Sequence, residues 1–146
     1  MAELHSASDQ AQVLDTMIAL TRLSALQRAI VAGSGGMQLY LGLRRRGFMR
    51  VATIATSWLP RKQHAIGLLA DHSAASIERA LNEISPFLGT NVTVVILLDA
   101  NEHDSSLKVR TKLQQMGFQI EAGVRCHQGL VLSACRQGQS RVEKAA

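Results

Sequence analysis

Aromatic residues and cysteines are scarce in this sequence, and each shortage limits how the fold can be stabilised. Phe, Trp and Tyr make up 3% of the 146 residues, so the hydrophobic core must be built from aliphatic side chains. Cys126 and Cys135 are too few for a disulfide framework, and nothing around them has the spacing of metal ligands. Two free thiols are typical of a protein in a reducing compartment.

Long apolar segments are also missing. No apolar run approaches the roughly 20 residues that cross a bilayer. The first residues, Met-Ala-Glu-Leu-His-Ser-Ala-Ser-Asp, do not place a basic segment before an apolar one, as a secretory signal peptide does. These features predict a cytoplasmic protein with no membrane partner, and the length predicts a single domain.

Charge is unevenly distributed along the chain. No Asp or Glu occurs in the 55 residues from 16 to 70. Eight cations occupy that stretch: Arg22, Arg28, Arg44, Arg45, Arg46, Arg50, Arg61 and Lys62. A surface of one sign attracts anions, although an ordinary solvated face is the commoner outcome.

The densest part of this stretch, Leu43–Arg50, leaves a nucleic-acid partner open. The simpler explanation is that cations at a helix end complement the helix dipole. Few aromatic side chains accompany the arginines, which argues against stacking on single-stranded bases.

Hydrophobic periodicity predicts an α/β fold, a mostly parallel three-layer Rossmann-like sheet with a C-terminal antiparallel hairpin and an extra N-terminal helix. Three expected helices begin after caps at Ser8-Asp9, Ser73 and Ser105, and the first of them runs to about Gln27. A further helix is expected over Met37–Arg46, ended by Gly47. The expected strands cover 29–32, 51–56, 64–70, 92–98, 118–125 and 130–136.

This pattern predicts three segments. Residues 1–28 form a helix packed on the domain, 29–136 form the α/β domain, and 137–146 form a polar tail. The first helix could equally be the face of a homodimer or bind another protein. The unpaired edge of the hairpin is a second candidate for such a contact.

Small and polar residues follow four of the expected strands, where an open sheet of this type binds ligands. The segments are Gly33-Ser34-Gly35-Gly36, Thr56-Ser57, Asp71-His72 and Asp99–Asp104. Loops are polar in general, so this clustering has an ordinary explanation as well. We expect a small-molecule site at this edge.

The segment Gly33–Gly36 could hold an anion. Glycines permit a positive φ and let backbone N–H groups approach a ligand, and the helix that follows adds its dipole. The spacing lacks the full G-x-G-x-x-G pattern, and close packing between strand and helix would select the same glycines. The turn alone leaves both explanations open.

Two longer patterns resemble a known family. Val31-Ala32-Gly33-Ser34-Gly35-Gly36 resembles the glycine turn of class I S-adenosylmethionine-dependent methyltransferases, in which an acidic residue precedes three spaced glycines. Gly117–Glu121 and Gly129–Arg136, after a helix, resemble the reversed hairpin that closes the family's sheet. The resemblance covers residues 29–136 and implies S-adenosylmethionine as cofactor. The implied cofactor-binding residues are Gly33, Ser34, Gly35, Gly36, Thr56, Ser57, Asp71 and Asp99.

The chain departs from this family where the family holds the cofactor. Val31 stands where an acidic residue often precedes the glycines, and Thr56 or Ser57 stands where a carboxylate binds the ribose. A neutral hydroxyl lacks the charge-assisted hydrogen bond, which is roughly twice as strong. One βα unit is also missing between Ser57 and His64.

These departures leave three alternatives for the site. It binds S-adenosylmethionine weakly, with Asp71 or Asp99 substituting; it binds a more anionic ligand such as a nucleotide phosphate; or it binds nothing and the fold serves as a partner module. We expect a binding or regulatory module with an eroded site. An active methyltransferase of unknown substrate is the first alternative, and a nucleotide- or nucleic-acid-binding protein is the second.

Catalytic groups are not obvious in the sequence. His72 and His103 each adjoin an aspartate and could act as bases. Neighbouring residues in an extended chain point apart, so these pairs are not dyads by default. Ser73 is expected to be a helix cap, because serine is common there.

Overall fold

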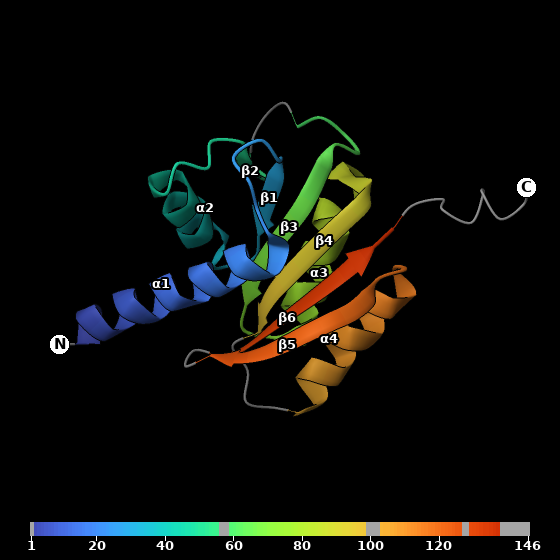
Figure 1. Ribbon diagram of the computed structural model, residues 1–146. Helices are drawn as coiled ribbons and strands as arrows, with labels where there is room; N and C mark the ends of the chain where they lie inside the picture. Colours follow the sequence, from blue (N-terminus) through green and yellow to red (C-terminus); the bar gives the residue numbers. More distant parts are fainter. Residues whose placement is uncertain (1, 56–58, 99–102, 127–128, 138–146) are drawn as a thin grey trace, which may run out of the picture.

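The computed structural model describes residues 2–55, 59–98, 103–126 and 129–137, with side chains described from residue 11 onward and, in the last helix, from residue 105. Helices cover both faces of one mixed sheet (Figure 1). The elements are α1 (Ala2–Thr21), β1 (Ala29–Ala32), α2 (Gly36–Arg45), β2 (Val51–Thr53), β3 (His64–Asp71), α3 (Ala74–Ile84), the 3₁₀ helix η1 (Ser85–Phe87), β4 (Leu88–Leu98), α4 (His103–Gln115), β5 (Gln119–Cys126) and β6 (Gly129–Arg136).

The sheet has six strands in the order β2-β1-β3-β4-β6-β5. The strands β2, β1, β3 and β4 are parallel, and β6 runs antiparallel between β4 and β5. The prediction of a mostly parallel sheet with a terminal hairpin is confirmed. After β1 the chain adds β2 on one side and then β3 on the other, so the strand order reverses between β1 and β3. Open α/β sheets bind ligands at such a point.

Two hydrophobic layers lie on opposite faces of the sheet. One layer joins the sheet to α3 and α4, and the other joins it to α1 and α2. Consecutive residues of β3 alternate between them, since Leu69 belongs to the first layer and Leu68 to the second. Both side chains are fully buried, which explains why this strand is apolar almost throughout.

The first helix is longer at its start and shorter at its end than its sequence suggests. The predicted cap at Ser8-Asp9 is wrong, because α1 begins at Ala2 and runs through both residues. It ends at Thr21, whose hydroxyl donates to the carbonyls of Met17 and Ile18, and Arg22 then takes a φ of 53°. A left-handed residue at this point is a common way to end a helix. No helix in the described part of the chain is both long and apolar enough to cross a membrane.

Three other boundaries differ from the prediction. The strand expected over 51–56 ends at Thr53, and β4 begins at Leu88, four residues before the expected Val92. Ser105 is not a cap but a buried residue within α4. In β4 the early start was hidden because Leu88 pairs with His64, whereas Gly89, Thr90 and Asn91 fall in an irregularity of the register before Thr93 pairs with Ile66.

Two local predictions are confirmed. Ser73 caps α3, because its hydroxyl accepts a hydrogen bond from the Ser76 N–H at 3.1 Å. Gly47 ends α2 with a φ of 93°, as expected for glycine in the position that follows a helix.

His64, at the start of β3, is a buried titratable residue far from the carboxyl ends of the strands. It is 2% exposed, and its Nδ1 lies 3.0 Å from the carbonyl oxygen of Phe87, so this nitrogen donates. Burial lowers the pKa of His64 below its ordinary value of 6.5, and the positive charge of Arg28 lowers it further. The Phe87 hydrogen bond opposes this shift.

This lowered pKa predicts a loss of stability in mild acid. Below about pH 6.5 His64 binds a proton in the unfolded state more readily than in the folded state. The free energy of unfolding therefore falls as the pH decreases through this range. Urea unfolding of the wild type and of His64→Asn, measured between about pH 5 and 8, should show a flatter profile for the variant. Parallel profiles would mean that another group sets the pH dependence.

Candidate functional site

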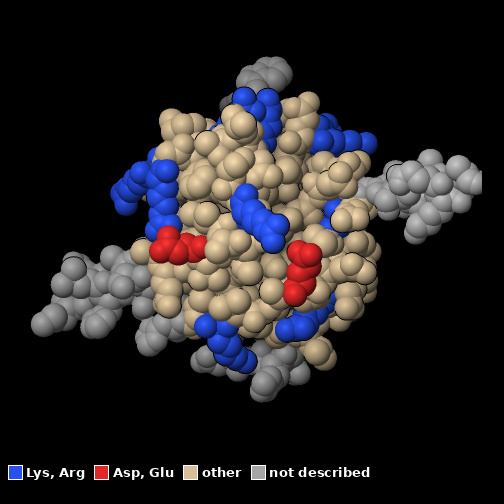
Figure 2. Space-filling view, viewed as in Figure 1, with Lys and Arg blue, Asp and Glu red and all other residues tan. Residues whose placement is uncertain are grey.

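A cleft of about 1050 Å³ lies between α1 and α2 and opens at the carboxyl ends of the parallel strands. Figure 2 shows the face that α1 and α2 cover, where basic side chains are scattered over a mainly uncharged surface with few acidic ones. The cleft is lined from α1 by Ala11, Val13 and Leu14, from α2 and the turn before it by Ser34, Gly35, Met37, Gln38, Leu39, Leu41, Gly42, Arg45 and Arg46, and from the ends of β3 and β4 by Ala70, Asp71, His72 and Leu97.

The glycine turn at the end of β1 is bound to the end of β3. The Ser34 N–H donates to Asp71 Oδ2 and the Ser34 hydroxyl donates to Asp71 Oδ1, each at 3.1 Å. The Gly35 N–H donates to the Ala70 carbonyl at 3.0 Å, and the Gly36 N–H donates to the Gly33 carbonyl at 3.0 Å. The backbone donors of residues 34–36 are therefore satisfied within the chain.

The same close approach explains two of the glycines. Gly33 has a φ of 93°, and a Cβ there would lie 2.3 Å from the Ala70 carbonyl oxygen. A Cβ at Gly35 would lie 2.9 Å from the Cβ of Ala70. A Cβ at Gly36 would meet nothing closer than 3.7 Å. Packing of the turn against β3 thus requires glycine at 33 and 35 without any ligand.

Asp71 sets the electrostatics of the turn. Besides the two bonds from Ser34, its Oδ1 accepts the N–H of His72 at 2.8 Å. An anion bound at this turn would need the Ser34 N–H and hydroxyl, which already donate to the Asp71 carboxylate. The arrangement disfavours the nucleotide-phosphate alternative at the turn, because a phosphate would have to displace a like charge.

The other end of the cleft is closed by contacts between α1 and α2. Arg46 forms an ion pair with Asp15, and its Nη2 donates to the Ala11 carbonyl at 3.4 Å. Gly42 lets the helices approach, since a Cβ there would lie 2.6 Å from Leu14 Cδ2. Sequence reasoning missed these residues as part of the site. The available signal was Asp15, the last carboxylate before the stretch without acids.

The structure brings together five of the eight predicted site residues. Gly33, Ser34, Gly35, Gly36 and Asp71 lie at the reversal point of the strand order, around the mouth of the cleft. The other three, Thr56, Ser57 and Asp99, lie outside the described residues, as do the side chains of His103 and Asp104.

The chain was compared with protein families, curated proteins and solved structures, and only solved structures are similar to it. No protein-family model matches the chain, and no curated protein matches it significantly. Among solved structures it is similar to an S-adenosylmethionine-dependent methyltransferase from Aquifex aeolicus, with a TM-score of 0.57, 13% identity and coverage of 88% of this chain and 89% of that one. The fold is that of the S-adenosylmethionine-dependent methyltransferases.

Two further structures with this fold are similar over the same share of the chain. An S-adenosylmethionine-dependent O-methyltransferase from Thermotoga maritima has a TM-score of 0.63 and 11% identity, with 88% of this chain and 66% of that one covered. A ribosomal protein L11 methylase from Lactobacillus delbrueckii subsp. bulgaricus has a TM-score of 0.61 and 15% identity, with 88% and 79% covered. The predicted methyltransferase-like topology is confirmed.

Proposed function

We propose that the cleft between α1 and α2 is a reduced S-adenosylmethionine site, and that the domain serves as a binding or regulatory module rather than as an efficient methyltransferase. The methyltransferase fold and the position of the cleft at the reversal of the strand order support a site of this kind. The hydrogen bonds that the site residues already form within the chain support the reduction of the site.

The hydrogen bonds of the glycine turn carry the proposal. A turn that grips a cofactor offers backbone N–H groups to it, whereas here Asp71 and Ala70 accept them from Ser34 and Gly35. The sequence also has no carboxylate from 16 to 70, so no acidic side chain follows β2 to bind a ribose. A cofactor would be held mainly by apolar contact with α1 and α2, which gives modest affinity.

An active methyltransferase remains the first alternative. The similar enzymes support it through their fold, and His72 is at the mouth of the cleft. The hydrogen bond between His72 and Asp71 at 2.8 Å runs from the backbone N–H of His72 to Asp71 Oδ1. A cytoplasmic location and a homodimer through α1 or the exposed edge of β5 also stay predictions.

An NMR titration tests the proposal at the residues concerned. We expect S-adenosylmethionine and S-adenosylhomocysteine to shift the amide signals of Ser34 and Gly35 in fast exchange, and only near millimolar ligand, where binding is worth about 4 kcal/mol. The signal of Gly117, which follows α4 on the opposite face of the sheet from α1 and α2, serves as an internal control. Slow exchange with saturation at equimolar ligand would contradict a reduced site, and no shift at the turn would contradict binding there.

A further inference from the structure

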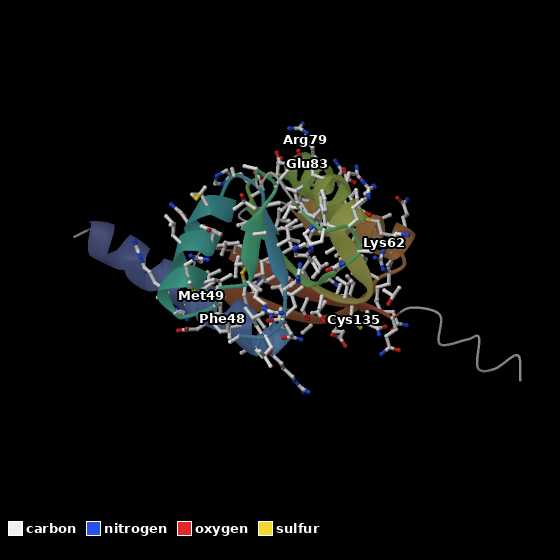
Figure 3. The ribbon with its side chains drawn as sticks, turned by 90° about the horizontal axis from the view of Figure 1, so that it is seen from above. Phe48, Met49, Lys62, Arg79, Glu83 and Cys135 are labelled. Carbon is white, nitrogen blue, oxygen red and sulfur yellow. The ribbon has the colours of Figure 1, made fainter. Side chains whose placement is uncertain are left out.

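The amino ends of the parallel strands carry a row of basic residues. Parallel strands begin at the same edge of a sheet, so the segments that enter β1, β2 and β3 share one edge; β3 starts two residues before β1 in register, because Ala29 pairs with Ile66. Arg28 precedes β1 and Arg50 precedes β2, and the residues that follow them, Ala29 and Val51, pair directly. Figure 3 looks onto this edge, with Phe48 and Met49 at one side and Lys62, just before β3, at the other.

This edge is exposed and mainly basic, although the exposed Glu83, near the end of α3, is also seen in the view of it in Figure 3. Arg45 and Arg46 at the end of α2 line the cleft. The other six exposed cations of the segments that enter the three strands or end α2 are Arg22, Arg28, Arg44, Arg50, Arg61 and Lys62. These segments lie within residues 16–70, which contain no Asp or Glu. The edge is opposite the glycine turn and the cleft mouth, so it is separate from the proposed cofactor site.

The loops of the basic edge are held in place by hydrogen bonds. Arg50 Nη1 donates to the Leu26 carbonyl and Arg44 Nη1 donates to the Met49 carbonyl, each at 3.2 Å. The Lys62 N–H donates to the Pro86 carbonyl at 3.1 Å, which ties its loop to the start of β4. Because the loops are already fixed, binding a partner here costs side-chain entropy but little backbone entropy.

We propose that this basic edge binds the phosphodiester backbone of duplex nucleic acid without reading its sequence. Five of the six cations are arginines, whose planar guanidinium groups suit phosphate oxygens. The starts of β1 and β2 are about 5 Å apart, so Arg28 and Arg50 lie beside each other, and Lys62 lies further out along the direction of β3. These cations can contact several closely spaced phosphates. The described edge presents cations and loop tips but no groove-filling element that would read base edges, which limits recognition to the backbone.

An anionic bilayer is the competing partner, since two apolar side chains project at the same edge. Leu26 is 78% exposed and Met49 is 58% exposed. Interfacial membrane binding relies on a larger apolar area, often with Trp, Phe and Leu side chains, beside a polar face rich in Lys and Arg. Phe48 is only half-buried but packs against the α1–α2 core layer, so nucleic acid is the better match.

The salt dependence of binding to a short mixed-sequence duplex DNA tests the proposal. Each phosphate contact adds about 0.9 to the slope of log K against log salt concentration. We expect the double variant Arg28→Gln with Lys62→Asn to reduce the slope by about 1.8 between roughly 50 and 200 mM NaCl. Asn suits position 62, because Lys62 has a φ of 60°.

Matched controls separate position from net charge. Arg79→Gln with Arg125→Gln removes the same charge from exposed sites on α3 and β5 and should leave the slope unchanged. Leu26→Ser should also leave duplex binding unchanged.

Two results would overturn the proposal: equal slopes for the two double variants, or no duplex binding by the wild type at about 50 mM NaCl. Binding to phosphatidylglycerol vesicles that Leu26→Ser abolishes, without duplex binding, would assign the edge to a membrane instead. Asp71→Ala should not affect duplex binding, so failure of the cofactor site stays distinguishable.

Discussion

Replacing Gly33 with alanine is expected to destabilise the fold by roughly 3 kcal/mol or more. The new Cβ would lie 2.3 Å from the Ala70 carbonyl oxygen. Neither atom can move without its backbone, because the position of a Cβ is fixed by the backbone that carries it. The φ of 93° adds strain of its own, since an alanine rarely adopts it. Urea unfolding of the variant, followed by circular dichroism, gives the free energy of unfolding directly.

Gly47→Ala is the matched control for this effect. Gly47 has the same φ of 93°, but a Cβ there would meet nothing within 4 Å. It should therefore show the backbone strain alone, about 1 kcal/mol. The difference between the two variants measures the close approach of the turn to β3. Equal losses would mean that this approach does not require glycine at position 33.

The second large effect is expected at Leu43, which anchors α2 to the sheet. Its side chain is 0% exposed and belongs to the layer between the sheet and the first two helices. Leu43→Ala leaves a cavity at a site surrounded by buried side chains, so we expect a loss of about 2–5 kcal/mol in the free energy of unfolding. Thermal and urea unfolding should agree on this loss.

Leu41→Ala on the same helix separates packing from helix propensity. Leu41 is 44% exposed and lines the cleft, and the substitution is chemically identical. It should change stability by less than about 0.5 kcal/mol. A loss comparable to that of Leu43→Ala would indicate that α2 packs with its other face toward the sheet.

The fold was predictable because its signals are local. Short apolar runs at 29–32 and 64–70 define strands, and glycine after an amphipathic segment marks the end of α2. Boundaries failed where the deciding contact is distant in sequence. Nothing local reveals that the strand starts at Leu88, because the pairing of Leu88 with His64 decides this.

The candidate site was predictable in its location but not in its chemistry. Strand ends place Gly33–Gly36 and Asp71 at one edge, as expected from an open parallel sheet. The sequence could not show that Asp71 accepts two hydrogen bonds from Ser34, because 37 positions separate the residues. The glycines therefore suggested a ligand turn, whereas contact with β3 is enough to explain two of them.

Calorimetric titration of S-adenosylmethionine into the wild type and Asp71→Ala tests most directly whether the hydrogen bonds from Ser34 to Asp71 weaken cofactor binding at the turn. The account predicts a wild-type dissociation constant near 1 mM or weaker. It also predicts up to roughly tenfold tighter binding in Asp71→Ala, because the Ser34 donors are released and a like charge beside the ligand carboxylate is removed. Asp71→Asn, which keeps an acceptor for Ser34, should bind with intermediate affinity. Micromolar binding by the wild type that weakens in Asp71→Ala would contradict the account, since Asp71 would then hold the ligand rather than the turn.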